Sequence, residues 1–407
     1  MKALWIRVNL IVLMVLVVFL AWAGPGNASE VTNAEILKRL DAMGQLIQEM
    51  GTEIKTLKKE NKELKAELEK VGKGQAERPT VAANHVKAAS VSAGTPAEVP
   101  VTSLVKVPET TEGLGASFEV LYMRPSRSNL DYATVDSDTD GHPEGSLAKV
   151  EPDRSGGGRF GLSYNFGSGT AVYGQYMKLN SKYSDNVVEP AGGSLWATWT
   201  HTDSTIDSQN LDEATMNYDF DHEVFDLGVK KWLEVGNDFG MQIDAGLRHA
   251  KMKQNIDINY QRSGGGAFSD VHNENNFSGW GPRLGLGLDW QVGKGFSLFG
   301  SAAGSVLMGD FDMNIKQVDN GTTSIFSIDD SEDNRVVPVL EMRAGLEYAY
   351  QLENGMFVGA KVGYEWQNWF NMVVARRNVD DVDEQLMYTD TTDVSLDGFF
   401  LEGFINF

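Results

Sequence analysis

From Gly113 to the C-terminus, apolar and polar residues alternate one by one over long segments. The clearest alternation covers residues 283–290, 340–348 and 358–367. Successive side chains of a β-strand point to opposite faces, so this period of two predicts strands with one apolar and one polar face. The alternation by itself fits two architectures. In a soluble sandwich the polar face meets water, whereas in an outer-membrane barrel the apolar face meets lipid.

The lengths of the segments and their connections favour the barrel. The alternating segments run to about ten residues or more, as tilted membrane-spanning strands require. Short turns are predicted at 167–169, 236–238, 293–295 and 353–355, and long polar connections at 127–155, 180–213, 257–275, 311–334 and 371–392. This regular exchange of short turns and long loops is typical of outer-membrane barrels. We predict an all-β transmembrane antiparallel β-barrel over 113–407, with about ten strands, or twelve if SLWATWTHT in the second long connection forms a hairpin.

Aromatic residues mark the ends of the predicted strands. Phe407 closes an alternating face, and we interpret this terminal aromatic residue as an assembly signal read by the barrel-assembly machinery. Tryptophans gather near strand ends, as the interfacial girdles of such barrels require. These tryptophans are Trp280, Trp290, Trp366 and Trp369.

The N-terminus has the pattern of a secretory signal peptide. Lys2 and Arg7 precede an unbroken apolar run over 10–23, and Gly26-Asn27-Ala28 offers a cleavage site with small residues. The run is shorter than the ~20 residues that a spanning helix needs. We therefore predict a signal peptide over 1–28, which directs the mature chain to the cell outer membrane with its N-terminal segment in the periplasm.

A strict heptad repeat follows, within a predicted periplasmic segment over 29–72. Spacings of four and three alternate without a miss, and this repeat predicts a left-handed coiled coil. The seam residues are Ile36, Leu40, Met43, Ile47, Met50, Ile54, Leu57, Asn61, Leu64, Leu68 and Val71. A single amphipathic helix packed on its own barrel is the alternative interpretation.

The coiled coil predicts a homo-oligomer. Its core residues favour a parallel dimer, and Asn61 at a core position would fix the register. Porin-like barrels more often form trimers, so dimer and trimer both stay open, and contact with the cell wall is a further role for the rod. Residues 73–112 are rich in Pro, Ala and Thr and are predicted to be an extended linker.

The composition excludes some partners and chemistries. The formal net charge of -22 argues against nucleic acid, since phosphate binding needs a basic surface. The chain has no cysteine, which rules out disulfides, thiolate metal sites and a cysteine nucleophile. No cofactor is indicated.

Several stretches of the predicted barrel are similar to a known family. GASFEVLYMRPSRSNLDYA, DAGLRHAKM, GWGPRLGLGLDWQVGKGFSLFGSAAGSVLMGDF and GYEWQNWF resemble the Legionella-type major outer-membrane protein family of pore-forming barrels. The resemblance covers roughly 113–407 and none of the coiled coil. It implies an outer-membrane porin that lets small polar solutes or ions diffuse passively, and it transfers no active-site residues.

If the alternation holds, charged residues of both signs line the lumen. Such walls would favour small polar or charged solutes, but in a narrow barrel the same side chains can pair and close the lumen. A structural or surface-binding barrel with a closed lumen is therefore the alternative function. The predicted lumen residues are Arg159, Asp244, Arg248, Arg283, Asp289, Glu341, Arg343, Glu347, Lys361, Glu365 and Glu402.

Two further patterns suggest chemistry more weakly. Asp136, Asp138 and Asp140 open like a Ca²⁺-binding loop, but the twelfth position is Leu147 in place of the expected Glu. The neighbours Asp221 and His222 could activate water at the barrel rim. The sequence contains no hydrolase signature, and we predict that the chain is not an enzyme.

Overall fold

The computed structural model describes residues 112–201, 203–204, 206, 211–235, 238–262, 266–378 and 387–407, with the backbone alone at 375–378 and 387–390. The chain divides into two units, Met1–Pro96 and Ala97–Phe407, and every described residue belongs to the second. The predicted signal peptide, the coiled coil and the linker up to residue 111 lie outside the described residues. No described helix is long and apolar enough to cross a membrane.

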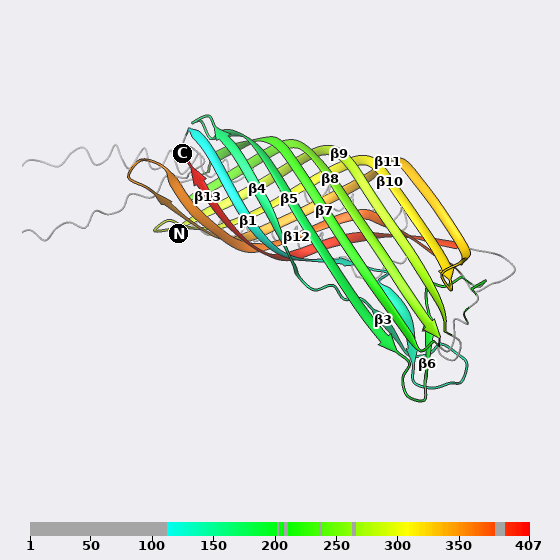
Figure 1. Cartoon of the computed structure of the whole chain (residues 1–407). Helices are drawn as coiled ribbons and strands as arrows, with labels where there is room; N and C mark the ends of the chain where they lie inside the picture. The colour runs from blue at the N-terminus through cyan, green and yellow to red at the C-terminus, as the bar shows by residue number, and fades with distance from the viewer. Residues whose placement is uncertain are drawn as a thin grey trace, which may run out of the picture. The chain divides into compact units, whose positions relative to one another are not determined.

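The described residues form thirteen β-strands, coloured along the chain in Figure 1. The bounds are β1 Gly113–Arg127, β2 Asp131–Asp136, β3 Ser146–Lys149, β4 Ser155–Asn165, β5 Thr170–Val188, β6 Ser194–Ala197, β7 Glu213–Glu234, β8 Phe239–Arg262, β9 Ala267–Gly293, β10 Phe296–Asp319, β11 Thr323–Gln351, β12 Phe357–Asn378 and β13 Met387–Asn406.

Ten of these strands close into one antiparallel barrel, in the order β1-β13-β12-β11-β10-β9-β8-β7-β5-β4. Strand β1 closes the ring because it pairs with β13 on one side and β4 on the other. Gly115 lies opposite Asn406, so the barrel begins and ends at the same end of the sheet. We call this end, which also carries the connections β4–β5, β7–β8, β9–β10 and β11–β12, the short-turn end. The predicted antiparallel barrel of about ten strands is confirmed.

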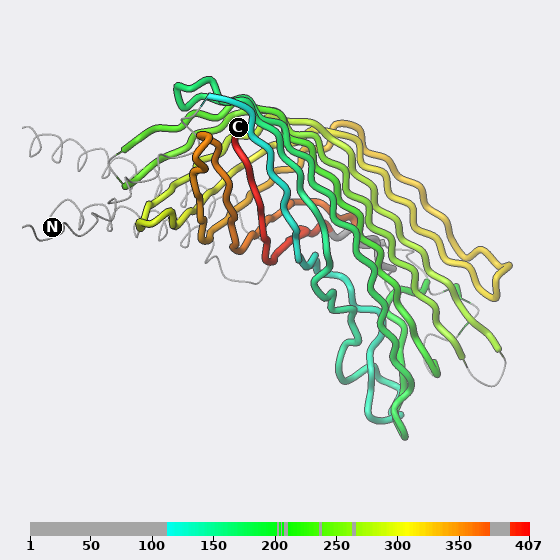
Figure 2. The backbone as a smooth tube through the Cα atoms, turned by 60° about the vertical axis from the view of Figure 1, so that its left-hand side comes forward, coloured from blue at the N-terminus to red at the C-terminus, as the bar shows by residue number. Residues whose placement is uncertain are grey.

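At the opposite end, the extended end, the strands run much farther than predicted (Figure 2). Strand β9 has 27 residues and β11 has 29, against the 9–11 that span a bilayer. The polar stretches 257–275, 311–334 and 371–392 belong mostly to these strands, so their prediction as long loops was wrong. The prediction interpreted polar residues as loop residues. Beyond the lipid, however, the outer face of a strand meets water and is polar as well.

The other two predicted long connections contain the three strands of a small sheet at the extended end, whereas residues 180–188 of the second continue strand β5 of the barrel. Strand β2 pairs with β3 and β6, and β6 contains Ser194–Ala197 of the SLWATWTHT segment. This segment does not add a hairpin to the barrel, so the alternative of twelve strands was wrong. The tryptophans of this segment are buried: Trp199 is 3 % exposed, and its indole N–H donates to the Asp131 carbonyl at 2.7 Å.

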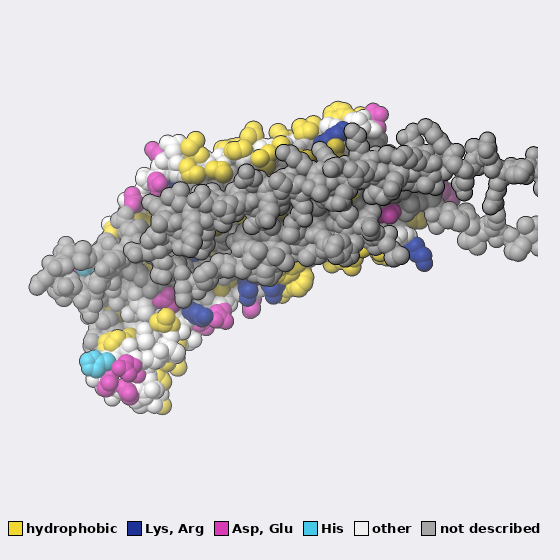
Figure 3. Space-filling view, turned by 180° about the vertical axis from the view of Figure 1, so that it is seen from behind, with side chains coloured by type: hydrophobic (Ala, Val, Ile, Leu, Met, Phe, Trp, Pro, Cys, Tyr) yellow, Lys and Arg dark blue, Asp and Glu magenta, His cyan; other side chains and the backbone are white. Residues whose placement is uncertain are grey.

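The two faces of the barrel differ as the alternation predicts. On β1 the side chains of Phe118, Val120 and Tyr122 are exposed on the outside, and the alternate residues Glu119, Leu121 and Met123 are buried inside. Apolar side chains likewise cover the outer surface elsewhere (Figure 3). On β1 the run of outward-facing apolar residues ends at Tyr122, and the next outward-facing residue is Arg124.

The tryptophans divide between the two faces. Trp280 and Trp290 are exposed, 58 % and 41 %, on the outer face of β9. Trp369 is fully buried and packs on His222 inside the barrel, so its assignment to an interfacial girdle was wrong. Trp369 and Trp366 are three residues apart on one strand, which places them on opposite faces.

Candidate functional site: a closed lumen

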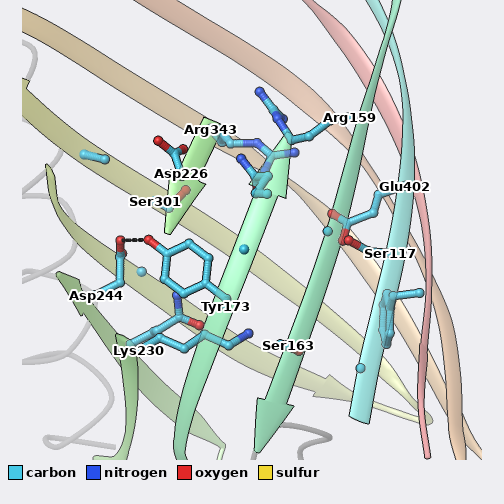
Figure 4. A pocket seen from close by; sticks show the side chains of 18 of the residues that line it. Ser117, Arg159, Ser163, Tyr173, Asp226, Lys230, Asp244, Ser301, Arg343 and Glu402 are labelled. Atoms are coloured by element: carbon cyan, nitrogen blue, oxygen red, sulfur yellow. Dashed lines mark hydrogen bonds between the residues drawn. The ribbon is translucent and has the colours of Figure 1, made fainter. Parts of the chain in front are cut away.

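A polar chamber occupies the interior of the barrel near the short-turn end. Its volume is about 240 Å³, and Ser117, Ser163 and Lys230 contribute to its wall (Figure 4). Gln242 and Asn406 line it as well. Six basic and six acidic side chains line the chamber. The charge of the lining is therefore balanced, which argues for mutual neutralisation more than for a strong preference for one sign of ion.

On its side toward the extended end, the chamber is bounded by a layer of ion pairs. Arg159 on β4 contacts Glu119 on β1 and, at 2.6 Å, Glu365 on β12. Arg343 on β11 contacts the same two carboxylates, with its Nε 3.1 Å from Glu365. Two guanidiniums thus share two carboxylates, and both of these carboxylates are nearly inaccessible to solvent.

A second set of pairs completes the ion-pair layer on the other side of the lumen. Arg248 on β8 binds Asp226 through two bonds of 2.7 Å, and it reaches Glu341 on β11 at 2.7 Å. Arg283 contacts Asp244 and approaches Glu341 at 3.4 Å. A buried charge is costly unless it is paired, and these pairs supply the compensation.

Between the ion-pair layer and the extended end, side chains from opposite walls of the barrel contact each other. His222 on β7 and Trp369 on β12 are five strands apart in the ring of ten, and their ring centroids are 4.7 Å apart. Gln367 on β12 reaches the sulfur of Met177 on β5 at 3.8 Å. Farther along, Arg127 on β1 donates to Gln254 on β8 at 3.1 Å. The side chains thus touch across the full diameter.

Two described residues between β6 and β7, His201 and Ser204, contact inward side chains of β10 at the extended end of the lumen. The backbone N–H of His201 donates to Gln317 on β10 at 2.7 Å, and the Ser204 hydroxyl donates to Asp319 at 2.9 Å. Gln317 and Asp319 are fully buried. We call the His201 and Ser204 contacts the loop cap.

All eleven predicted lumen residues lie on inward positions of their strands. The structure brings ten of them together around the chamber, and Asp289 is 9 % exposed on the inner face of β9 without lining the chamber. Lys361 pairs with Glu347 at 2.9 Å, and Glu402 points into the chamber beside Ser117. Their roles in passage or closure stay a prediction.

Two inward acids, Glu119 and Asp226, were missed by the sequence analysis. Each lies among apolar neighbours, in FEVLY and VFDLG, where the local alternation is less clear than in the segments used for the prediction. Both acids share the inward face with small or polar residues toward the short-turn end of their strands, such as Ser117 and Lys230, and this local pattern could have identified them. His222 was considered only as a rim residue, whereas it is fully buried.

The weaker patterns have structural explanations. Carboxylate oxygens of Asp136, Asp138 and Asp140 lie within 4.8 Å of one another, yet each of the three accepts a hydrogen bond from a backbone N–H of its own loop. These bonds account for the cluster, and calcium binding there stays a prediction. Asp221 lies on the outward face of β7 while His222 is buried inside, so the two cannot act on one water.

One titratable group of the small sheet is buried at the extended end, against the barrel strands. Tyr132 on β2 is fully buried, and its hydroxyl donates to Asp185 at 2.9 Å. Burial, followed by the nearby carboxylate of Asp185, raises the pKa of Tyr132. The Tyr132 carbonyl in turn accepts from the Tyr260 hydroxyl at 2.6 Å, which fixes the small sheet to β8.

A closed antiparallel barrel with an apolar outer band and a polar interior defines the class of outer-membrane β-barrels. A family model described as the Legionella pneumophila major outer membrane protein precursor matches residues 106–407. The chain belongs to this family, which confirms the resemblance found in the sequence, and it is an outer-membrane protein.

Comparison with solved structures gives more distant similarities. The outer membrane protease OmpT of Escherichia coli is 12 % identical, with 72 % of this chain and 96 % of OmpT covered and a TM-score of 0.42. The translocator domain of the autotransporter NalP of Neisseria meningitidis is 14 % identical, with 73 % and 89 % covered and a TM-score of 0.31. A FadL homologue of Pseudomonas aeruginosa is 8 % identical, with 74 % and 91 % covered and a TM-score of 0.24. Comparison with curated protein sequences gives no match.

The lengths of the connections suggest an orientation for the barrel. In outer-membrane barrels the short turns face the periplasm and the longer connections face outward. We infer that the short-turn end and the chamber face the periplasm, and that the small sheet and the loop cap face the exterior.

Proposed function

We propose that the chain is a structural outer-membrane barrel whose resting lumen is closed to solutes, and whose long external strands form its working surface. The contact between His222 and Trp369 carries this proposal, because it joins diametrically opposite strands. The ion-pair layer below and the loop cap above support the same conclusion at two further levels.

Swelling of liposomes tests the proposal. Vesicles that contain the refolded chain should swell in a small sugar no faster than protein-free vesicles. The variant Trp369→Gly removes the ring that spans the lumen, and it should swell faster if the ion-pair layer also parts. Rapid swelling with the unaltered chain would refute the closed lumen.

A weakly selective diffusion pore, predicted from the sequence, is the second candidate function. The chamber favours it, since a space of about 240 Å³ already lies beside the ion-pair layer. In this case the ion pairs act as a gate. The two candidates differ in one observable: a pore conducts ions without any substitution, and its ion preference changes when Arg343 and Lys361 are reversed in charge.

For the N-terminal part we propose export by a signal peptide over 1–28 and self-association through the heptad repeat over 29–72. The support is the unbroken spacing of the seam residues. A periplasmic rod would then hold two or three barrels together, with residues 73–112 as the link.

A further inference from the structure

We propose that the outer face of β1, β4 and β13 binds a phosphorylated glycolipid of the outer leaflet, such as lipopolysaccharide, through Arg124 and Arg154. The two arginines lie at the outer edge of the apolar band. On the outer face of β1, Arg124 is the next residue after Tyr122 toward the extended end. On the outer face of β13, Asp397 is the next residue after Phe399 in the same direction. This is the level at which lipid headgroups begin.

The arrangement of charge leaves an excess of cation at this edge. Arg124 and Arg154 both bind Asp397, at 3.1 and 3.0 Å, one on each carboxylate oxygen. Tyr364 donates to the same carboxylate at 2.5 Å. Two guanidiniums therefore share one acid. Inside the barrel, by contrast, the four arginines of the ion-pair layer face five carboxylates.

Contacts with Asp397 and Phe399 hold the two arginine side chains in place, and both side chains stay accessible to solvent. The Arg154 guanidinium lies 5.5 Å from the centre of the Phe399 ring, and Asp397 fixes one edge of each guanidinium. The Arg124 and Arg154 side chains are 45 % and 31 % exposed, whereas Asp397 is 14 % exposed. A guanidinium carries five N–H donors, so the exposed edges can bind phosphate oxygens bidentately while Asp397 stays bound.

The surface beside the arginines suits the rest of such a lipid. Gly156 and Gly158 are outward positions of β4, and Gly156 pairs with Tyr122 across the strands. A methyl group at Gly156 would meet no atom within 4 Å, so the surface there is open. Tyr122, Phe160 and Phe399 border this area and are each about half exposed. Acyl chains would lie on these rings, with a phosphate at the arginines.

The two arginines and the apolar band together favour one class of ligand over other lipids and over free phosphate. An acidic or zwitterionic lipid without an exposed phosphomonoester offers fewer oxygens to two adjacent guanidiniums, and a free phosphate has no acyl chains to rest on the apolar band. A phosphorylated glycolipid supplies both. The proposal is independent of whether the lumen conducts.

Binding of purified lipopolysaccharide to the refolded full chain in detergent micelles tests the inference, with the retained lipid measured after size-exclusion chromatography. Removal of each guanidinium, with its charge-assisted hydrogen bonds to phosphate, should weaken binding on the order of tenfold. We expect R124A/R154A to bind about a hundredfold more weakly than the unaltered chain. Dephosphorylated glycolipid should bind as weakly as that variant does, and inorganic phosphate should not displace bound glycolipid.

The matched control is Lys182→Ala, which removes an outward cation of β5 that is 82 % exposed and lies beyond the boundary. It should leave binding unchanged. If R124A/R154A fails to fold, R124K/R154K keeps both charges without the bidentate geometry, and should bind about tenfold more weakly. Equal binding by the arginine variants and the unaltered chain, or by dephosphorylated glycolipid, would overturn the proposal.

Discussion

At the scale of single residues, four arginines hold the ion-pair layer of the lumen together. Arg159, Arg248, Arg283 and Arg343 each reach acids on neighbouring or more distant strands, which a planar group with five donors can do. Each carboxylate in the layer has a cationic partner. The layer is therefore stable only while its members are complete, because removal of one partner leaves a buried charge without compensation.

Arg248→Ala should therefore be strongly destabilising. Asp226 and Glu341 would remain buried without their main partner, at a cost of about 3–5 kcal/mol in the free energy of unfolding. Equilibrium unfolding in urea, with the protein in lipid vesicles, measures this change. Lys182→Ala removes an exposed pair with Asp219 and should leave stability unchanged. Equal stability of the two variants would contradict the structural role of the layer.

Because alternate residues of a strand share one face, the sequence alone predicted most of the side chains that point into the barrel. Once 283–290 and 340–348 were assigned as strands, the inward position of Arg283, Glu341 and Arg343 followed. The partner of each arginine did not follow, because pairing depends on which strands face each other and on how far each side chain reaches. The contact of His222 with Trp369 joins residues 147 positions apart, and no local pattern carries that information.

At the scale of elements, the strands continue past the membrane and support the external structure. Beyond the apolar band the two faces of β7 to β11 are in different surroundings, with water outside and a packed core inside. Met216, Phe220 and Ile256 belong to that core. The predicted strands end where polarity begins, because polar residues were interpreted as loop residues. The core below the small sheet explains why these strands persist.

Trp199→Ala should loosen the external loops and leave the barrel intact. The ring is buried against the small sheet, and its removal should cost about 3–5 kcal/mol of local packing. Limited proteolysis of intact vesicles, followed by mass spectrometry, should then show faster cleavage within 189–212. Leu147→Ala, at an exposed residue of β3, is the control and should not change the cleavage rate. Cleavage within the membrane-spanning strands would contradict this local effect.

At the scale of the whole molecule, a closed barrel is combined with a predicted periplasmic rod. The barrel belongs to an outer-membrane family from residue 106 onward, whereas the heptad repeat precedes the matched region. The two parts therefore call for separate tests. A closed lumen would make the external surface and the assembly, more than transport, the contribution of the chain to the outer membrane.

Deletion of residues 36–71 should reduce the assembly without unfolding the barrel. The heptad seam predicts a dimer or trimer in the full chain, and its removal should leave monomeric barrels. Analytical ultracentrifugation in density-matched detergent measures the mass of the assembly, and circular dichroism checks the strand content. An unchanged mass would exclude the rod as the source of self-association.

The most direct test of the closed lumen is single-channel recording from the refolded chain in a planar bilayer. A closed lumen predicts no stable conductance steps from the unaltered protein, because His222 and Trp369 meet above a complete ion-pair layer. Stable steps whose ion preference shifts when Arg343 and Lys361 are reversed in charge would contradict the closed lumen, and would establish a diffusion pore.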